Sequence, residues 1–389
     1  MQKVIYFDNN ATTFVAPEAM EEMLPFFKTR YGNPSSMHEF GGENKKYVDK
    51  ARQQIADLIG ANSKEIIFTS CGTESDNTAI WSALQTNPQK RRIVTTKVEH
   101  PAVFETCKWW EGQGYEVTFL PVDEQGNLNL HDVDDAIKKD TALVSVMWAN
   151  NETGVIFPVE QIAKMAKDKG VLFHTDAVQA VGKLPVNLKN SSIDMLSVSG
   201  HKLHAPKGVG MLYVREGTKF ESFMKGGHQE LARRAGTENL AYIAGFGKAC
   251  ELAVAKVEKE NTYVKNMRDK LEKGIIEKIS DVKINGDTKN RLPNTLNISF
   301  KYVEGESILL MLSEKGICAS SGSACTSGSL EPSHILMAMK VPFEFAHGSI
   351  RFSLSIYNTE EEIDFVLKEL PIIIERLRKI SPFVKKDGK

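Results

Sequence analysis

The chain lacks several features that mark particular classes of protein. Its 389 residues include no uncharged apolar run close to the roughly 20 residues that a membrane-spanning helix needs. The opening residues, MQKVIYFDNNATT, show no basic stretch followed by an apolar run, so we expect no secretory signal. The formal net charge of −1 gives no electrostatic reason to expect a nucleic acid or a membrane surface as a partner.

Cysteine is also scarce. Five cysteines are scattered along the chain, namely Cys71, Cys107, Cys250, Cys318 and Cys325. Their odd number argues against a disulfide framework and indicates a reducing compartment, which we expect to be the cytoplasm. No CxxC or HExxH motif occurs, so we expect neither a structural nor a catalytic zinc site.

Residues 65–214 alternate short apolar segments with helical patterns. This alternation predicts an α/β fold with a mostly parallel sheet that is covered by helices on both faces. The expected strands are 65–69, 93–96, 117–120, 142–148, 171–174, 193–198 and 209–214. Because such sheets bind ligands at the carboxyl ends of their strands, residues that directly follow these segments are candidates for a site.

The pattern changes after residue 239. A helical stretch rich in lysine and glutamate covers 240–279, and shorter strands and helices follow, up to a last helix at 360–378. These segments predict a second, smaller α+β domain. We expect residues 15–255 to form the large domain, and residues 1–14 together with 256–389 to form the small one.

Asp176 ends one apolar segment, and Lys202 follows the next among small and polar residues. This pair suits a site for a pyridine ring, because a carboxylate keeps the ring nitrogen protonated and a lysine forms a Schiff base with an aldehyde on the ring. Buried aspartates and exposed lysines are common, however. The pair therefore carries weight only with a phosphate site, a reactive group and a substrate anchor.

Gly72 and Thr73 precede a helix, where free N–H groups and the helix dipole favour an anion. Ser199, His201 and Thr237 supply further donors for a phosphate. The same Gly-Thr-Glu-Ser sequence also fits a simple helix cap, and this alternative stays open.

Other polar residues have two interpretations each. His100 either stacks on a planar cofactor or caps the helix that Pro101 opens. Gln179 and Asn151 can bond a ring hydroxyl, although Asn151 equally fits a polar turn. Residues 8–13, DNNATT, either form a turn or line the site.

Cys325 differs from the other cysteines because it lies in a Ser/Gly-rich segment, 319–329, inside the small domain. That composition is typical of a linker or of a mobile functional loop. A nucleophilic thiol must be accessible and able to ionise, which favours Cys325; we expect the other four cysteines to be structural. Arg351 lies in an alternating strand and either binds a substrate carboxylate or points to solvent.

Together these segments resemble the pyridoxal-phosphate-dependent cysteine desulfurases of the class V aminotransferase fold, in particular the branch of nitrogen fixation and iron–sulfur cluster assembly. The matching segments keep the family's order over almost the whole chain. They are YFDNNATT (6–13), YGNPSS (31–36), GTES (72–75), VEHPAV (98–103), ANNETG (149–154), HTDAVQA (174–180), SGHKLHAPKG (199–208), RRAGTEN (233–239), SSGSACTSGSLEPSHIL (320–336) and IRFSLS (350–355).

The resemblance implies pyridoxal 5′-phosphate as the cofactor, held in a fold type I large domain with a seven-stranded sheet. Lys202 is then the Schiff-base lysine, Asp176 pairs with the pyridine nitrogen, and His100 stacks on the ring. The remaining implied contacts of the cofactor are Gln179 and Asn151 at the ring, Gly72, Thr73, Ser199 and His201 at the phosphate, and Thr237 at the phosphate of the other subunit.

The resemblance further implies that L-cysteine is the substrate, with its carboxylate on Arg351 and Asn151, and that L-alanine is the product. Cys325, on a loop at about 319–330, takes the sulfur as a persulfide. The implied partners are a second copy of the chain and an iron–sulfur scaffold or another persulfide acceptor. No metal is expected beyond transient ligation of an iron–sulfur species by Cys325. A selenocysteine lyase or an aminotransferase on the same fold is the alternative activity, and an aminotransferase would not need Cys325.

Overall fold

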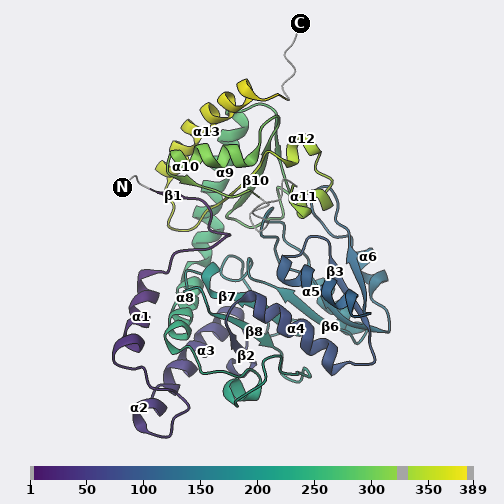
Figure 1. Ribbon diagram of the computed structural model, residues 1–389, viewed down its shortest axis with the longest axis vertical. Helices are drawn as coiled ribbons and strands as arrows, with labels where there is room; N and C mark the ends of the chain where they lie inside the picture. The colour runs from purple at the N-terminus through teal and green to yellow at the C-terminus, as the bar shows by residue number, and fades with distance from the viewer. Residues whose placement is uncertain (1–3, 322–331, 383–389) are drawn as a thin grey trace.

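The computed structural model describes residues 4–321 and 332–382, and its largest element is a seven-stranded sheet (Figure 1). The strands in their order across the sheet are β2 (Ile66–Thr69), β8 (Gly210–Val214), β7 (Met195–Ser199), β6 (Leu172–Asp176), β5 (Thr141–Ser145), β3 (Arg92–Thr96) and β4 (Glu116–Leu120). β8 runs antiparallel to both of its neighbours, and the other pairs are parallel. The predicted α/β class with a mostly parallel sheet is confirmed.

Both faces of the sheet are buried, because successive strand residues enter different hydrophobic clusters. Leu143 and Met195 pack on the side of α4 (Gly72–Thr86) and α5 (Pro101–Gly112). Their neighbours Val144 and Leu196 belong to the cluster on the opposite face. The helices that contribute to that cluster include α1 (Pro17–Lys28), α3 (Lys45–Ile59), α6 (Leu130–Ala136), α7 (Val159–Asp168) and α8 (Leu240–Lys259).

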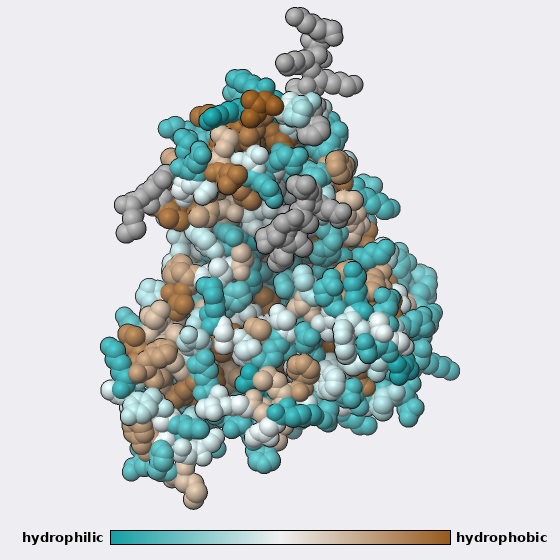
Figure 2. All heavy atoms as spheres, in the orientation of Figure 1, coloured by the Kyte–Doolittle hydropathy of each residue, from teal (hydrophilic) through white to brown (hydrophobic). Residues whose placement is uncertain are grey.

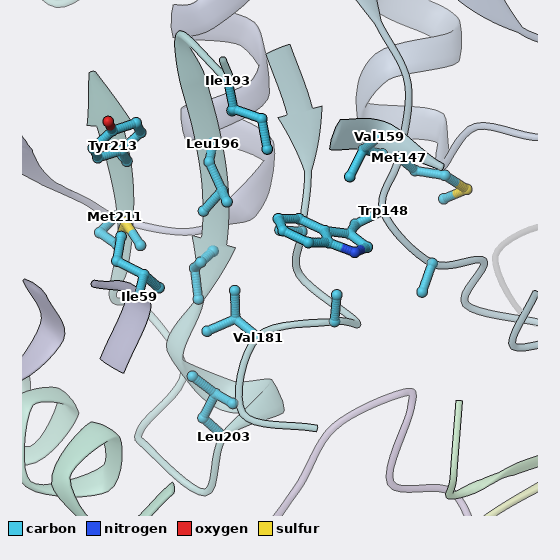
Figure 3. Packing of buried hydrophobic residues seen from close by; sticks show 14 of the residues in the cluster. Ile59, Met147, Trp148, Val159, Val181, Ile193, Leu196, Leu203, Met211 and Tyr213 are labelled. Carbon is cyan, nitrogen blue, oxygen red and sulfur yellow. The ribbon is translucent and has the colours of Figure 1, made fainter. Parts of the chain in front are cut away.

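Figure 3 shows part of the cluster on this opposite face, where Ile59 of α3 lies close to Met211 of β8.

Local sequence signals determine where the flanking helices begin and end. α1 and α5 each start with a proline, whose fixed φ and missing N–H suit a first helical position. α3 ends at Gly60, whose φ of 63° is in the left-handed region that glycine adopts without strain.

A second hydrophobic core lies apart from the large sheet (Figure 1). It joins a three-stranded antiparallel sheet to three helices and to a parallel pair of short strands. These elements are β12 (Ser349–Ser353), β10 (Thr295–Phe300), β9 (Val282–Ile284), α9 (Lys265–Lys278), α10 (Gly305–Glu314), α13 (Glu360–Ile380), β1 (Ile5–Tyr6) and β11 (Ile317–Cys318). The start of the chain therefore belongs to the same core as its last third.

α8 and α9 are joined by a π-helix, Glu260–Val264, without a break in the helical path. The boundary that we predict between residues 255 and 256 lies just before this junction and stays a prediction. Two residues of α11 (His334–Ala338), Ile335 and Leu336, pack in the cluster of the large sheet although they lie beyond that boundary. The short helices that remain are α2 (Glu39–Gly42), α12 (Phe343–Ala346), and the 3₁₀ segments Ser63–Glu65, Gly200–Lys202 and Gln229–Ala232.

The surface is largely polar, but hydrophobic side chains gather over α1 and α2, at the lower left of Figure 2. Leu24, Phe27, Tyr31, Met37 and Phe40 are all exposed in this region. Across the described ranges 4–321 and 332–382, no helix combines the length and the apolar character needed to cross a membrane.

We expect Leu196→Ala to lower the free energy of unfolding by about 2–5 kcal/mol, because Leu196 is 0% exposed in a central strand and its truncation leaves a cavity. Leu310→Ala is the matched control. Leu310 is 70% exposed on α10, so the same change there should cost less than about 0.5 kcal/mol. Urea unfolding of both variants measures the difference, and equal costs would contradict this account of the core.

Candidate active site

A cavity of about 310 Å³ opens at the carboxyl ends of β5, β6 and β7 and at the start of α4. It brings together the residues predicted for the ring, for the phosphate within this chain and for the substrate carboxylate. They are Gly72, Thr73, His100, Asn151, Asp176, Gln179, Ser199, His201, Lys202 and Arg351. Thr237 is exposed and does not line this cavity, whereas Cys325 lies outside the described residues.

One end of the cavity is built to receive an anion. Gly72 is the first residue of α4, and the side chain of its N-cap residue, Cys71, makes no capping hydrogen bond. The N–H groups of the first helical turn therefore face the cavity without intrahelical partners. A Cβ on Gly72 would come within 2.9 Å of Val178 Cγ2, so only glycine lets this turn approach so closely.

His201 adds a neutral imidazole near this end. Burial, followed by the nearby Lys202 and other cations, lowers the pKa of His201 to about 4. Its Nδ1 lies 3.1 Å from the Thr12 hydroxyl. His201 can therefore form hydrogen bonds with an anion at neutral pH without bringing a full charge.

The middle of the cavity holds Asp176 and His100. Asp176 ends β6, and its Oδ1 accepts a hydrogen bond of 2.9 Å from Val178 N. Burial raises its pKa, and the nearby basic groups His100 and Lys202 oppose that rise. Such a carboxylate is stabilised by a cation that binds next to it.

His100 does cap α5, because its Nδ1 accepts a hydrogen bond of 3.1 Å from Ala102 N. Burial lowers the pKa of His100. Because Nδ1 accepts this bond, the neutral ring carries its proton on Nε2. The capping interpretation is correct, and it does not exclude the stacking role, since the ring also lines the cavity.

Lys202 sits in the 3₁₀ turn that follows β7, and its Nζ donates to the main-chain oxygens of Asn10 at 2.7 Å and Ala11 at 2.6 Å. Burial is the main cause that lowers its pKa to about 7, with Arg351 and Lys183 as further causes. An ordinary lysine titrates near 10.4, so Lys202 is a far better source of a neutral amine at physiological pH.

Arg351 lies at the other end of the cavity, in β12. It is 5% exposed, its Nη2 is 2.7 Å from Asp8 Oδ1, and its Nη1 donates to Asn151 O at 3.0 Å. Among the described residues, its Nε and Asn151 Oδ1 have no hydrogen-bond partner although both atoms are buried. Unpartnered buried polar atoms are costly, so their presence at the cavity indicates groups kept for a ligand.

Both interpretations of residues 8–13 are correct, because Ala11 N donates to Asp8 O at 3.0 Å in a turn, and Asn10 and Ala11 line the site. Asn10 O accepts from both Lys202 Nζ (2.7 Å) and Gln179 Nε2 (3.0 Å). Asn10 Nδ2 donates to Thr295 Oγ1 at 2.8 Å, and Asn294 donates to Asn10 Oδ1 at 3.0 Å. The DNN sequence was a signal for this role, but the partners of Asn10 are far away in the chain.

Asp76 and Cys71 are among the other lining residues that were not anticipated. Asp76, in the second turn of α4, is 1% exposed, and its pKa is raised by burial and then by the charge of Asp176. Cys71 was expected to pack as a small hydrophobe, and this prediction is wrong, because Cys71 is half-buried at the rim of the cavity. It precedes a helix start instead of filling a core.

The described residues on either side of segment 322–331 contact the cavity wall. Ser320 and Arg351 exchange main-chain hydrogen bonds of 3.2 and 2.6 Å. Ser333 donates to Glu152 Oε2 at 2.6 Å, directly after Asn151. The described residues Ser320 and Ser333 thus lie beside the site.

Comparison with known proteins agrees with this geometry. A cysteine desulfurase, NifS, of Azotobacter vinelandii is 57% identical over 385 residues, 99% of this chain and 96% of that protein. A solved structure titled NIFS-LIKE PROTEIN matches with a TM-score of 0.91 and 40% identity over 96% of this chain and all of the other. Another, SspA in complex with cysteine, matches with a TM-score of 0.81 and 34% identity over 91% of this chain and all of the other. The family model of the class-V aminotransferases matches residues 5–366, and the chain belongs to that family.

Proposed function

We propose that this chain is a cysteine desulfurase, which converts L-cysteine to L-alanine and leaves the sulfur as a persulfide on Cys325. The observation that carries the proposal is the cavity itself, where a lysine with a lowered pKa, a buried aspartate and an unsatisfied arginine converge. The relatives support it, since the Azotobacter vinelandii protein is named a cysteine desulfurase and SspA was solved with cysteine.

The residues at the cavity fit pyridoxal 5′-phosphate. The glycine-lined start of α4 suits its phosphate, the carboxylate of Asp176 suits a protonated ring nitrogen, and the unpartnered Asn151 Oδ1 and Arg351 Nε leave polar atoms for bound groups. When bound, the cofactor supplies an aldehyde for amines and a ring that accepts the electron pair released at the α-carbon.

The chain's own residues then have distinct tasks. Lys202 holds the cofactor through its amine and, once free, moves the proton of the substrate α-carbon. Asp176 keeps a proton on the ring nitrogen, and His100 stacks on the ring face. Arg351, with Asn151, holds the substrate carboxylate, and Asp8 has to give up part of its contact with Arg351 as the substrate enters.

Cys325 takes the sulfur in our proposal. Its thiolate attacks the sulfur of the substrate, the carbon–sulfur bond breaks, and its electron pair stays on the substrate carbon, which a proton then completes to alanine. Cys325 lies five residues after Ser320 in the sequence, and the main chain of Ser320 is hydrogen-bonded to that of Arg351 at the cavity, which supports this assignment.

The persulfide requires an acceptor, for which we propose an iron–sulfur scaffold or another sulfur-accepting protein. We also propose a homodimer in which Thr237 reaches the phosphate site of the partner subunit. Exposure of Thr237 away from its own cavity supports this, as do the exposed hydrophobic residues on α1 and α2.

Cys325→Ala should abolish sulfide release from L-cysteine in the presence of a thiol reductant, because no other group is proposed to take the sulfur. The visible absorbance of bound pyridoxal phosphate should persist, since Cys325 is not assigned to cofactor binding. Cys318→Ala is the matched control and should keep activity within about twofold. Sulfide release by Cys325→Ala at the wild-type rate would remove Cys325 from the mechanism.

The rate at which cofactor-free protein captures pyridoxal phosphate should rise with pH and level off above about 8. The sign follows from the pKa of Lys202, which is lowered to about 7, because the ammonium loses its proton as the pH passes that value and only the neutral amine reacts. Stopped-flow absorbance measures the midpoint, with Nα-acetyl-lysine as the reference amine near 10.4 and Lys202→Ala as the blank. A midpoint near 10 would show that the cavity does not perturb this lysine.

Sedimentation of the cofactor-bound protein should give twice the chain mass of 43.3 kDa. Leu24→Glu should shift the protein toward the monomer, because a charge in an apolar interface loses its hydration. Leu310→Glu places the same change on exposed α10 and should leave the dimer intact. A wild-type protein that sediments as a single chain would rule out the shared phosphate site.

A further inference from the structure

Behind Gln179 lies a buried lysine that the proposed mechanism does not use. Lys183 is 6% exposed, and its Nζ donates to Gln179 O at 3.2 Å and to Gln179 Oε1 at 3.1 Å. It follows a tight turn at Gly182, whose φ is +80° and where a Cβ would come within 2.3 Å of Leu203 Cδ2. Val181 precedes this turn, and Leu203 lies against it. Both side chains belong to the core seen in Figure 3. The backbone that carries Lys183 is therefore held rigidly.

The π-helix between α8 and α9 supplies the other partners of this lysine. Glu260, its first residue, is 9% exposed. Burial raises the pKa of Glu260 and lowers the pKa of Lys183, and each charge opposes the shift of the other. The next residue, Asn261, donates from Nδ2 to Lys183 O at 2.7 Å and to Val257 O at 2.8 Å. The π turn thus bonds the main chain of Lys183 through Asn261 and places Glu260 in the lining of the same cavity as Lys183. Such turns often occur at functional positions.

Two contacts fix the orientation of the Gln179 amide. An ammonium has donors only, so the atom that Lys183 contacts must be the oxygen of the amide. The Nε2 edge is thereby directed to the other side, where it donates to Asn10 O at 3.0 Å beside Lys202. Without Lys183, only the bond to Asn10 O is left to hold the amide in this orientation.

We propose that Lys183 is a positioning residue, which holds the Gln179 amide with its N–H edge toward the ring oxygen of the bound cofactor. The proposal rests on the proposed function, because the acceptor is an oxygen of pyridoxal phosphate. It assigns a task to the helical junction as well, since Asn261 holds the main chain of Lys183 from there.

The test compares Lys183→Met, Gln179→Ala and the double variant by titration with pyridoxal phosphate and by the position of its visible absorption band. Lys183→Met keeps the length of the side chain and removes the donors. We expect it to bind pyridoxal phosphate about tenfold more weakly, as for one lost buried hydrogen bond, with a displaced band. Gln179→Ala should show the same displacement, and the double variant should add nothing further, because both changes remove one interaction.

Glu260→Gln is the matched control. It removes a buried charge at the same junction but leaves the bonds from Lys183 to Gln179, so its absorption band should match the wild type. Lys183→Gln replaces Lys183→Met if the latter does not fold, since a neutral amide at position 183 can present either of its edges to Gln179.

Four outcomes overturn the proposal. Lys183→Met with the wild-type band and affinity, beside a displaced band for Gln179→Ala, overturns the positioning role alone. Additive effects in the double variant, or an equal displacement in Glu260→Gln, show that Lys183 acts through stability of the junction instead. A wild-type protein that gives no visible band with pyridoxal phosphate overturns the proposed function too, which distinguishes the two failures.

Discussion

The structure of the site depends on how positive charge is held in a largely buried cavity. Lys202, Arg351 and Lys183 lie close enough that each lowers the pKa of a neighbour, and Asp8, Asp176 and Glu260 oppose this effect. An ammonium that loses hydration without full compensation releases its proton easily. Lys202 is therefore a better source of neutral amine than an ordinary lysine, while Arg351 keeps its positive charge, because a guanidinium always stays charged.

Burial also shifts the pKa values of the acidic groups around Asp176, but it raises them. Asp76 and Glu99 are buried near it, and burial together with mutual repulsion raises the pKa of both. The pKa of Glu99 rises to about 8, so this side chain is neutral at physiological pH. Asp176 is supported by a main-chain N–H and by two nearby basic groups, which favour its charged form. A cation that binds beside Asp176 favours the same form.

Much of this arrangement could be predicted from the sequence, because the signals are local. Short apolar segments predicted the large sheet, and residues just after strands, such as Asp176 and Lys202, were brought to one edge by the parallel geometry. The direction of β8 could not be predicted, since an apolar run of five residues has the same pattern in a parallel and an antiparallel strand. The exposure of Cys71 was also missed, because a cysteine between a strand and a helix carries no pattern that separates a core position from the rim of a cavity.

The remaining contacts of the site join residues that are far apart in the sequence, so no local sequence pattern predicts them. Asn10 bonds Lys202, Gln179, Asn294, Thr295 and, through its N–H, Ser353 Oγ at 2.9 Å. These partners come from loops of the large sheet and from the smaller core. Asn10 therefore connects both parts of the fold to Lys202. The contacts of Lys183 could not be predicted for the same reason, because its partner Asn261 lies 78 positions further along the chain, next to Glu260. A sequence pattern reports the period of one element, whereas the orientation of the Gln179 amide is set by elements that meet only in the folded chain. Residues such as Asn10 and Lys183 become apparent only in the folded chain, where each buried donor and acceptor needs a partner.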